Sequence, residues 1–320
     1  MTNSEQEFFD DSIKNYYLKN LKPKEDEFEE YRLDALSHQQ SRQKLLKVTI
    51  ISSILIVILT AYISPGIIIL PIILAIVLIA FIDHWSDAPG KKFSRIDPKI
   101  QIFPTLFKIF GEKFHYSHDV DINLKDLDKK AKIIPRYDNY SLEDHVIGHF
   151  DDLNFEIFEA QLIQNSGSGM QQRSMTVFKG PIISIEMNKN FTSKTVIRSN
   201  SLTSKLFSSY ERLTLEDPIF EKEFDVYTTD QIEGRYLLTT SFMERLLHLS
   251  EFFDSQIECS FFDNKLLIMA NAPQRNLFES SSASIHSPIN LAQDLNNIIT
   301  EMGLIKEIVT ILKLDEKTGI

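Results

Sequence analysis

The feature of this sequence that most constrains its fold is an uninterrupted apolar run from Val48 to Ile82. The run contains no Asp, Glu, Lys, Arg, His, Asn or Gln. A single straight helix of this length would extend about 52 Å, whereas the hydrocarbon core of a bilayer is only about 30 Å thick. Ser64-Pro65-Gly66 lies in the middle, where proline removes a backbone donor and glycine permits a turn. The run therefore predicts a two-helix transmembrane hairpin, with legs at 48–63 and 67–82.

Basic residues near the apolar run set its predicted orientation. They precede the first leg and follow the second, namely Arg42, Lys44 and Lys47, then Lys91, Lys92, Arg95 and Lys99. Because loops rich in Lys and Arg stay on the cytoplasmic side of a membrane, both termini are expected in the cytoplasm. The sequence thus predicts a multi-pass protein of the cytoplasmic (inner) membrane whose first partner is the lipid bilayer.

The composition of the whole chain is that of a folded protein. Hydrophobic residues make up 43% of the sequence and Phe occurs 23 times, which is enough apolar surface for a core. The formal net charge of -11 at pH 7 argues against nucleic acid as a partner, because nucleic acids bind basic surfaces. The single cysteine, Cys259, excludes an internal disulfide and fits a reducing compartment.

The chain divides into four predicted segments. Residues 1–47 form a helical cytoplasmic arm, in which Pro23 is expected to interrupt the helix. Residues 48–82 form the hairpin, and residues 83–111 form a juxtamembrane linker with an amphipathic helix. Residues 112–320 form a cytoplasmic α+β domain, in which helices cover an antiparallel sheet.

Two hairpins are predicted within the α+β domain. Apolar residues alternate around Phe158 and again around Ile185, which is typical of an antiparallel pair of strands. Ile257–Phe262 and Lys265–Ala270 are two further β-rich runs. Asp263-Asn264, which separates them, is a two-residue hairpin signal. Residues 112–150, by contrast, are mixed and turn-rich.

Helices in this domain are predicted from capping signals and apolar spacing. Asp230 with Glu233, and Ser241 with Glu244, have the spacing of a capping box before an apolar-periodic stretch. The last helix carries an apolar seam at alternating spacings of four and three residues: Leu291, Leu295, Ile298, Met302, Ile305, Val309 and Leu312. We expect this seam to pack against the sheet of its own chain, and the alternative is a homo-oligomer through this C-terminal helix.

A set of motifs resembles a known family. They are Pro135-Arg136-Tyr137, Glu143-Asp144 with Gly148, Thr176-Val177-Phe178-Lys179-Gly180, Leu215-Glu216-Asp217-Pro218, Asp230-Gln231-Ile232-Glu233-Gly234-Arg235-Tyr236-Leu237-Leu238-Thr239, Met243-Glu244-Arg245-Leu246 and Phe262-Asp263-Asn264-Lys265. Together they resemble the bacterial domain-of-unknown-function family 3137, over roughly residues 98 to 314. The resemblance implies an N-terminal helical arm and two membrane helices before the domain. It implies no activity.

Two groups of polar residues are candidate sites. His145 and His149 are four residues apart, which would place both on one face of a helix as metal ligands, although hydrogen-bonded or exposed histidines are the favoured interpretation. Asp230, Glu233 and Arg235 combine a pair of acids with a nearby arginine and could support acid–base chemistry. The favoured interpretation is structural, with Asp230 capping a helix and Glu233 reaching back to complete the box.

The sequence predicts a binding or regulatory function. It contains no phosphate-binding loop, nucleophile elbow, zinc-ligand cysteine cluster or dinucleotide fingerprint, so no cofactor is predicted and a non-enzyme is favoured. The predicted function is a membrane-anchored cytoplasmic module that holds a ligand or a protein partner of unknown identity near lipid. The alternatives are a membrane-associated enzyme of unrecognised mechanism and a self-assembling membrane scaffold. A deep pocket that gathers the candidate residues would favour the enzyme.

Overall fold

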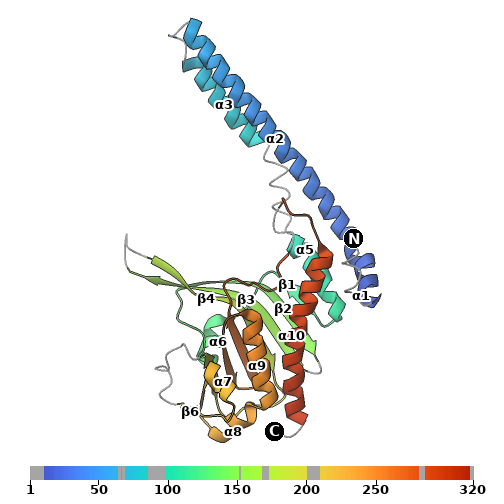
Figure 1. Cartoon of the computed structure of the whole chain (residues 1–320), viewed down its shortest axis with the longest axis vertical. Helices are drawn as coiled ribbons and strands as arrows, with labels where there is room; N and C mark the ends of the chain where they lie inside the picture. The colour runs from blue at the N-terminus through green and yellow to red at the C-terminus, as the bar shows by residue number, and fades with distance from the viewer. Residues whose placement is uncertain are drawn as a thin grey trace. The chain divides into compact units, whose positions relative to one another are not determined.

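The computed structural model describes residues 11–63, 66, 69–85, 98–150, 153–167, 173–199, 210–280 and 285–317 (Figure 1). These residues form helices and a large antiparallel sheet, in agreement with the predicted α+β class. The chain divides into two compact units. We call Met1–Thr105 with Ser280–Asp294 the helical unit, and Leu106–Glu279 with Leu295–Ile320 the sheet unit.

The described part of the helical unit starts with a helix of 53 residues, from Asp11 to Ile63. It consists of α1 (Asp11–Tyr16), the π-helical turn η1 (Tyr17–Leu21) and α2 (Lys22–Ile63). The expected interruption at Pro23 is therefore wrong. Pro23 lies in the first turn of α2, directly after the π turn, where the hydrogen-bond register shifts and the helix can continue past a residue without an N–H.

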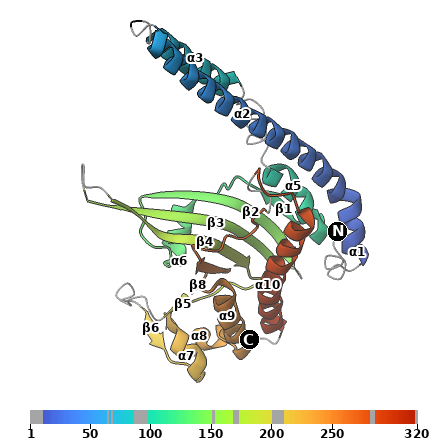
Figure 2. The ribbon, with the colours of Figure 1, turned by 45° about the horizontal axis from the view of Figure 1, so that its top comes forward.

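The apolar part of α2 lies beside a second apolar helix, α3 (Ile69–Trp85), in both views (Figures 1 and 2). Residues 64, 65, 67 and 68 of the connecting turn lie outside the described residues. The helix Asp11–Ile63 is long and apolar enough to cross a membrane, and Ile69–Phe81 is a shorter apolar stretch. Between α2 and α3 lies an apolar groove of about 290 Å³, lined by Ile50, Ser53, Ile54, Val57, Ile58, Ile72, Ala75, Ile76 and Ile79.

The polar part of α2 binds two other segments of the helical unit. Near its start, Lys24 Nζ donates a hydrogen bond to Thr105 Oγ1 (2.9 Å) at the end of α5 (Pro98–Leu106). Further along, Glu25, Glu29 and Arg32 hydrogen-bond to main-chain atoms of residues 285–291, where α10 (Leu291–Lys317) begins. We call this second set of contacts the α2 clasp.

The sheet unit contains a sheet whose nine described strands all pair in antiparallel fashion. The order is β1-β2-β3-β4-β9-β8-β5-β7-β6. The strands are β1 (His115–Ser117), β2 (Asn139–Phe150), β3 (Leu153–Ser166), β4 (Arg173–Glu186), β5 (Thr195–Ser199), β6 (Glu211–Leu213), β7 (Phe224–Thr228), β8 (Gln256–Phe262) and β9 (Lys265–Asn271). Both predicted hairpins are confirmed: β3 pairs with β4, and β8 pairs with β9 across Asp263-Asn264, where Asp263 has φ 53°.

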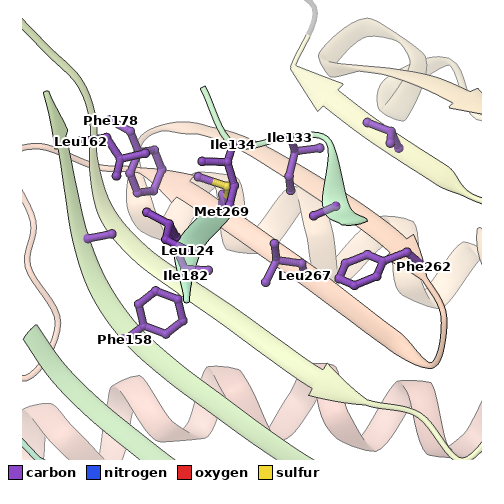
Figure 3. Packing of buried hydrophobic residues seen from close by; sticks show 13 residues of the cluster. Leu124, Ile133, Ile134, Phe158, Leu162, Phe178, Ile182, Phe262, Leu267 and Met269 are labelled. Carbon is purple, nitrogen blue, oxygen red and sulfur yellow. The ribbon is translucent and has the colours of Figure 1, made fainter. Parts of the chain in front are cut away.

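Helices cover both faces of this sheet. The described helices of the unit are η3 (Phe107–Phe110), α6 (Leu124–Ala131), α7 (Pro218–Glu223), α8 (Gln231–Leu237), α9 (Thr240–Phe253) and most of α10. Phe262 and Met269 belong to a buried apolar cluster with Leu124 of α6 (Figure 3). Phe261 points to the opposite face, since side chains alternate along a strand, and it contacts Phe242 of α9 with ring centroids 5.5 Å apart. The sheet is thus the middle of three layers.

The apolar seam of α10 is buried within the chain. Leu291, Leu295, Ile298, Met302, Ile305 and Val309 are each at most 2% exposed, whereas the side chain of Leu312 lies outside the described residues. On the same helix, Glu307 Oε2 pairs with Arg245 Nη1 of α9 at 3.2 Å, so the two helices lie side by side. The predicted packing of the seam inside its own chain is confirmed for these six residues.

The caps of α8 and α9 agree only in part with the capping boxes predicted. Asp230 caps α8, because its Oδ1 accepts hydrogen bonds from the backbone N–H of Ile232 (2.8 Å) and Glu233 (3.1 Å). Helix α9 begins two residues earlier than expected, and its cap is Thr239, whose Oγ1 accepts from the N–H of Phe242 at 3.2 Å. The expected cap at Ser241 is therefore wrong.

Asp230→Ala is expected to lower the free energy of unfolding by about 0.5 to 2 kcal/mol, because two amide groups of α8 lose their acceptor. Urea-induced unfolding of the purified chain, followed by circular dichroism, measures the difference. Asp230→Asn is the matched control, since its amide oxygen keeps the cap and should preserve most of the stability. Equal losses in both variants would show that Asp230 acts through its charge and not as a cap.

Candidate functional site

A pocket opens in the sheet unit where the paired ladder between β4 and β9 ends. The two strands pair only from Ile182↔Met269 to Glu186↔Lys265. Beyond this ladder lies a pocket of about 110 Å³, lined by Ile133, Pro135, Val177, Phe178, Arg198, Gln256, Glu258, Met269 and Asn271. Gly180 permits the close approach of the β4 backbone to β9 next to the pocket, because its φ is 150° and a Cβ there would collide with the carbonyl oxygen of Ala270. We call this cavity the sheet pocket.

The floor of the sheet pocket is built by strand register. Arg198 of β5 lies opposite Glu258 of β8, which in turn lies opposite Met269 of β9. In the next row on the same face, Gln256 lies opposite Asn271. Residues directly opposite in an antiparallel sheet project to the same side. Three strands from distant parts of the sequence therefore gather four polar side chains beside the apolar cluster of Figure 3.

A buried ion pair dominates the electrostatics of the sheet pocket. Arg198 donates from both Nε and Nη2 to Oε2 of Glu258, each at 2.8 Å, and the two side chains are only 9% and 16% exposed. Burial raises the pKa of the Glu258 carboxyl above its ordinary value, and the nearby Arg198 guanidinium acts in the opposite direction. Removal of either side chain would leave an uncompensated buried charge, which is destabilising, so the two residues form one structural pair.

The remaining lining of the pocket combines one more fixed polar group with an apolar wall. Oδ1 of Asn271 accepts a hydrogen bond from the backbone N–H of Lys179 at 3.2 Å, which leaves the side-chain amino group as a donor. Phe178 is 4% and Met269 is 2% exposed, and Ile133 is 1% exposed (Figure 3). Within the described residues, no group of three or more His, Cys, Asp or Glu side chains is arranged to hold a metal ion.

The structure separates the two histidines predicted as a pair. Both lie on β2, a strand that the sequence does not predict, and not on a helix. Four residues along a strand span about 13 Å, so one metal ion cannot bind both side chains. His145 Nε2 lies 2.8 Å from Oε1 of Glu156, and His149 Nδ1 lies 2.9 Å from Oδ1 of Asn154. The metal hypothesis assumes that His145 and His149 lie on one helix, and this assumption is therefore wrong.

Asp230 and Glu233 both lie at the N-terminus of α8, but Glu233 does not complete the predicted capping box. Its carboxylate instead accepts hydrogen bonds from the backbone N–H of Thr192 (3.1 Å) and of Ser193 (2.6 Å). Burial raises the pKa of Glu233, but these hydrogen bonds outweigh burial and hold it below its ordinary value. Arg235 is exposed and makes no ion pair with the residues that the structure describes.

Sequence reasoning missed the residues of the sheet pocket. A usable signal was present in the β-rich run from Gln256 to Phe262, where Gln256, Glu258 and Ser260 alternate with apolar residues. Such alternation places all three on one face. Because the sequence does not reveal which strand pairs with this run, it could not bring Arg198 or Asn271 to the same place.

Comparison with known proteins shows what parts of this chain are similar to. A crystal structure of the mycobacterial trehalose monomycolate transport factor A, TtfA, is similar with 13% sequence identity and a TM-score of 0.36, over 66% of this chain and 96% of that chain. Comparison with curated proteins found no match. The model of the family described as "Protein of unknown function (DUF3137)" matches residues 176–314, a stretch that includes Arg198, Glu258 and Asn271. The resemblance to DUF3137 is therefore confirmed for residues 176–314 of this chain.

Proposed function

We propose that this chain is a membrane-anchored binding module, in which α2 and α3 cross the bilayer as a hairpin and hold the sheet unit in the cytoplasm. One observation carries the proposal: the apolar side chains of both helices face outward. Ile63 is 68%, Ile69 is 71% and Leu70 is 69% exposed, and many neighbouring apolar side chains are also exposed. An apolar surface of this extent is stable in lipid and costly in water.

The lengths of the two helices support this arrangement. The apolar part of α2 ends at Ile63 and α3 begins at Ile69, so only a short turn would reach the far side of the bilayer. The Lys and Arg residues that flank the apolar run all precede α2's apolar part or follow α3, which favours the cytoplasm for both ends. Each apolar stretch is near the lower limit of about 17 residues, so the bilayer would thin locally.

The sheet pocket supports a binding function over catalysis. Of the candidate residues for acid–base chemistry, Asp230, Glu233 and Arg235 do not line it, and neither do His145 and His149. Its polar groups are instead held in an ion pair and in a hydrogen bond to the main chain. Fixed polar groups beside an apolar wall are typical of a site that orients a ligand.

The proposed topology is tested by reporter fusions at residue 1, after Gly66 and at residue 320. Alkaline phosphatase is active only outside the cytoplasm, and green fluorescent protein fluoresces inside. We expect fluorescence at both ends and phosphatase activity at Gly66. Deletion of residues 67–82 is the matched control, because a single remaining span should export the C-terminal reporter. Phosphatase activity at residue 320 of the full chain would contradict the hairpin.

A further inference from the structure

We infer that the sheet pocket binds a small neutral amide group, such as a peptide bond or the amide end of a longer molecule. This inference deepens the binding function proposed above and concerns the chemistry of its ligand. It rests on three properties of the pocket: its balanced charge, the donor and acceptor left unused by its own hydrogen bonds, and its size.

The charge of the pocket selects a neutral ligand. Arg198 and Glu258 face each other across β5 and β8 and cancel in net charge. A carboxylate in the pocket would be repelled by Glu258, and an ammonium would be repelled by Arg198. Either ion would also have to lose its hydration shell without a free counter-ion to replace it. A neutral polar group avoids both costs.

The remaining hydrogen-bonding capacity matches an amide. Nε and Nη2 of Arg198 both contact Oε2 of Glu258, and Oε1 accepts no hydrogen bond from the residues that the structure describes. Asn271 uses its Oδ1 for Lys179 N–H and keeps its amino group as a donor. An amide N–H can donate to Oε1 of Glu258 while the amide C=O accepts from Asn271. Because the amide carries its donor and acceptor on different atoms, it can reach two separate side chains.

The size and the wall of the pocket limit the ligand to a few heavy atoms. Its volume of about 110 Å³ lies well below the range of roughly 300 to 1,000 Å³ found for drug-sized ligands. Phe178, Met269 and Ile133 offer apolar surface for the carbon atoms beside the amide. A methyl-substituted amide fills these requirements better than urea or water, which have no apolar part.

N-methylacetamide is the probe that tests this inference. The full chain is labelled at its methionine ε-methyl groups and studied by NMR in detergent micelles. Met269 lines the pocket, and Met175, which is 60% exposed on β4, reports non-specific effects. We expect N-methylacetamide to shift the Met269 signal saturably and to leave Met175 unchanged. Sodium acetate, methylammonium chloride and 2-propanol should each require at least about tenfold higher concentration.

Two variants separate charge from hydrogen bonding. Glu258→Gln removes the negative charge beside Arg198, so acetate should now shift Met269 at roughly tenfold lower concentration than in the unmodified chain. Asn271→Asp keeps an acceptor for Lys179 N–H but removes the donor, so the response to N-methylacetamide should be lost. Unchanged signals of Met187, Met243 and Met302 confirm that each variant is folded.

Three results would overturn the inference: no shift of Met269, a shift parallel to that of Met175, or an equal response to acetate in the unmodified chain. None of them depends on how α2 and α3 meet the membrane. A failed titration with the expected reporter topology would remove the amide site and leave the anchor intact. A saturable shift of Met269 together with an exported C-terminal reporter would support the amide site and contradict the membrane hairpin.

Discussion

Leu295→Ala and Ile305→Ala are each expected to lower the free energy of unfolding of the sheet unit by about 2 to 5 kcal/mol. Leu295 is 0% and Ile305 is 2% exposed, so each truncation leaves a cavity that the surrounding side chains fill only in part. The loss combines the transfer free energy of the removed carbon atoms with the cost of that cavity. Chemical denaturation of the full chain in detergent, followed by far-ultraviolet circular dichroism, measures this loss of unfolding free energy.

Gly303→Ala is the matched control on the same helix. Gly303 is exposed and a Cβ there would meet no atom within 4 Å, so alanine should stabilise α10 by up to about 1 kcal/mol. The number of subunits should be the same in all three variants, because the seam is buried inside one chain. If the unmodified chain were a dimer and Leu295→Ala made it a folded monomer, the seam would be an interface between subunits.

The burial of this seam shows which parts of the fold the sequence predicts well. An apolar residue at every third or fourth position defines one face of a helix whatever the rest of the fold does. The same holds for β8 and β9, where Asp263-Asn264 supplies a residue that tolerates positive φ. These patterns are local, so they remain visible without knowledge of the strand order.

Strand β2 shows why other parts of the fold could not be predicted. Its sequence has charged and histidine residues on both faces, and a bulge between Glu143 and Val146 interrupts its alternation. Asp144 sits in this bulge with φ 60° and is 1% exposed, and its Oδ1 accepts a hydrogen bond from the hydroxyl of Tyr116 on β1 at 2.5 Å. A buried acid of this kind is explained only by a partner on another strand. The sheet pocket was missed for the same reason.

The α2 clasp is a second long-range contact that the sequence could not predict. Oε2 of Glu29 accepts from the backbone N–H of Ile289 at 3.1 Å and from Nε of Arg32 at 2.8 Å. Nη1 of Arg32 donates to the carbonyl oxygen of Ile285 at 2.8 Å. Glu25 accepts from the N–H of Leu291, the first residue of α10, at 2.9 Å and so satisfies an amide that has no partner within the helix.

Glu29→Ala is expected to destabilise the clasp by about 3 to 5 kcal/mol. The Arg32 side chain is 6% exposed and would lose the carboxylate that neutralises it. A loss of about 3 kcal/mol corresponds to a roughly hundredfold increase in the population of the open state. Hydrogen exchange at the amide of Ile289 should therefore accelerate by about that factor. Glu30→Ala removes the same charge from an exposed neighbouring position and should leave this exchange rate unchanged.

The pH dependence of the same amide distinguishes Glu29 from other groups. The hydrogen bonds from Arg32 hold the pKa of Glu29 below its ordinary value. A carboxyl with a lowered pKa in the folded chain stabilises the fold above its unfolded pKa of about 4.3, and this contribution is lost as the pH falls further through the folded value. Protection of Ile289, corrected for the intrinsic exchange rate, should therefore be constant from neutral pH down to about pH 5 and should fall only below about pH 4.3. A decrease between pH 7 and pH 6 would instead assign control of the clasp to a histidine, because no carboxyl with a lowered pKa titrates there.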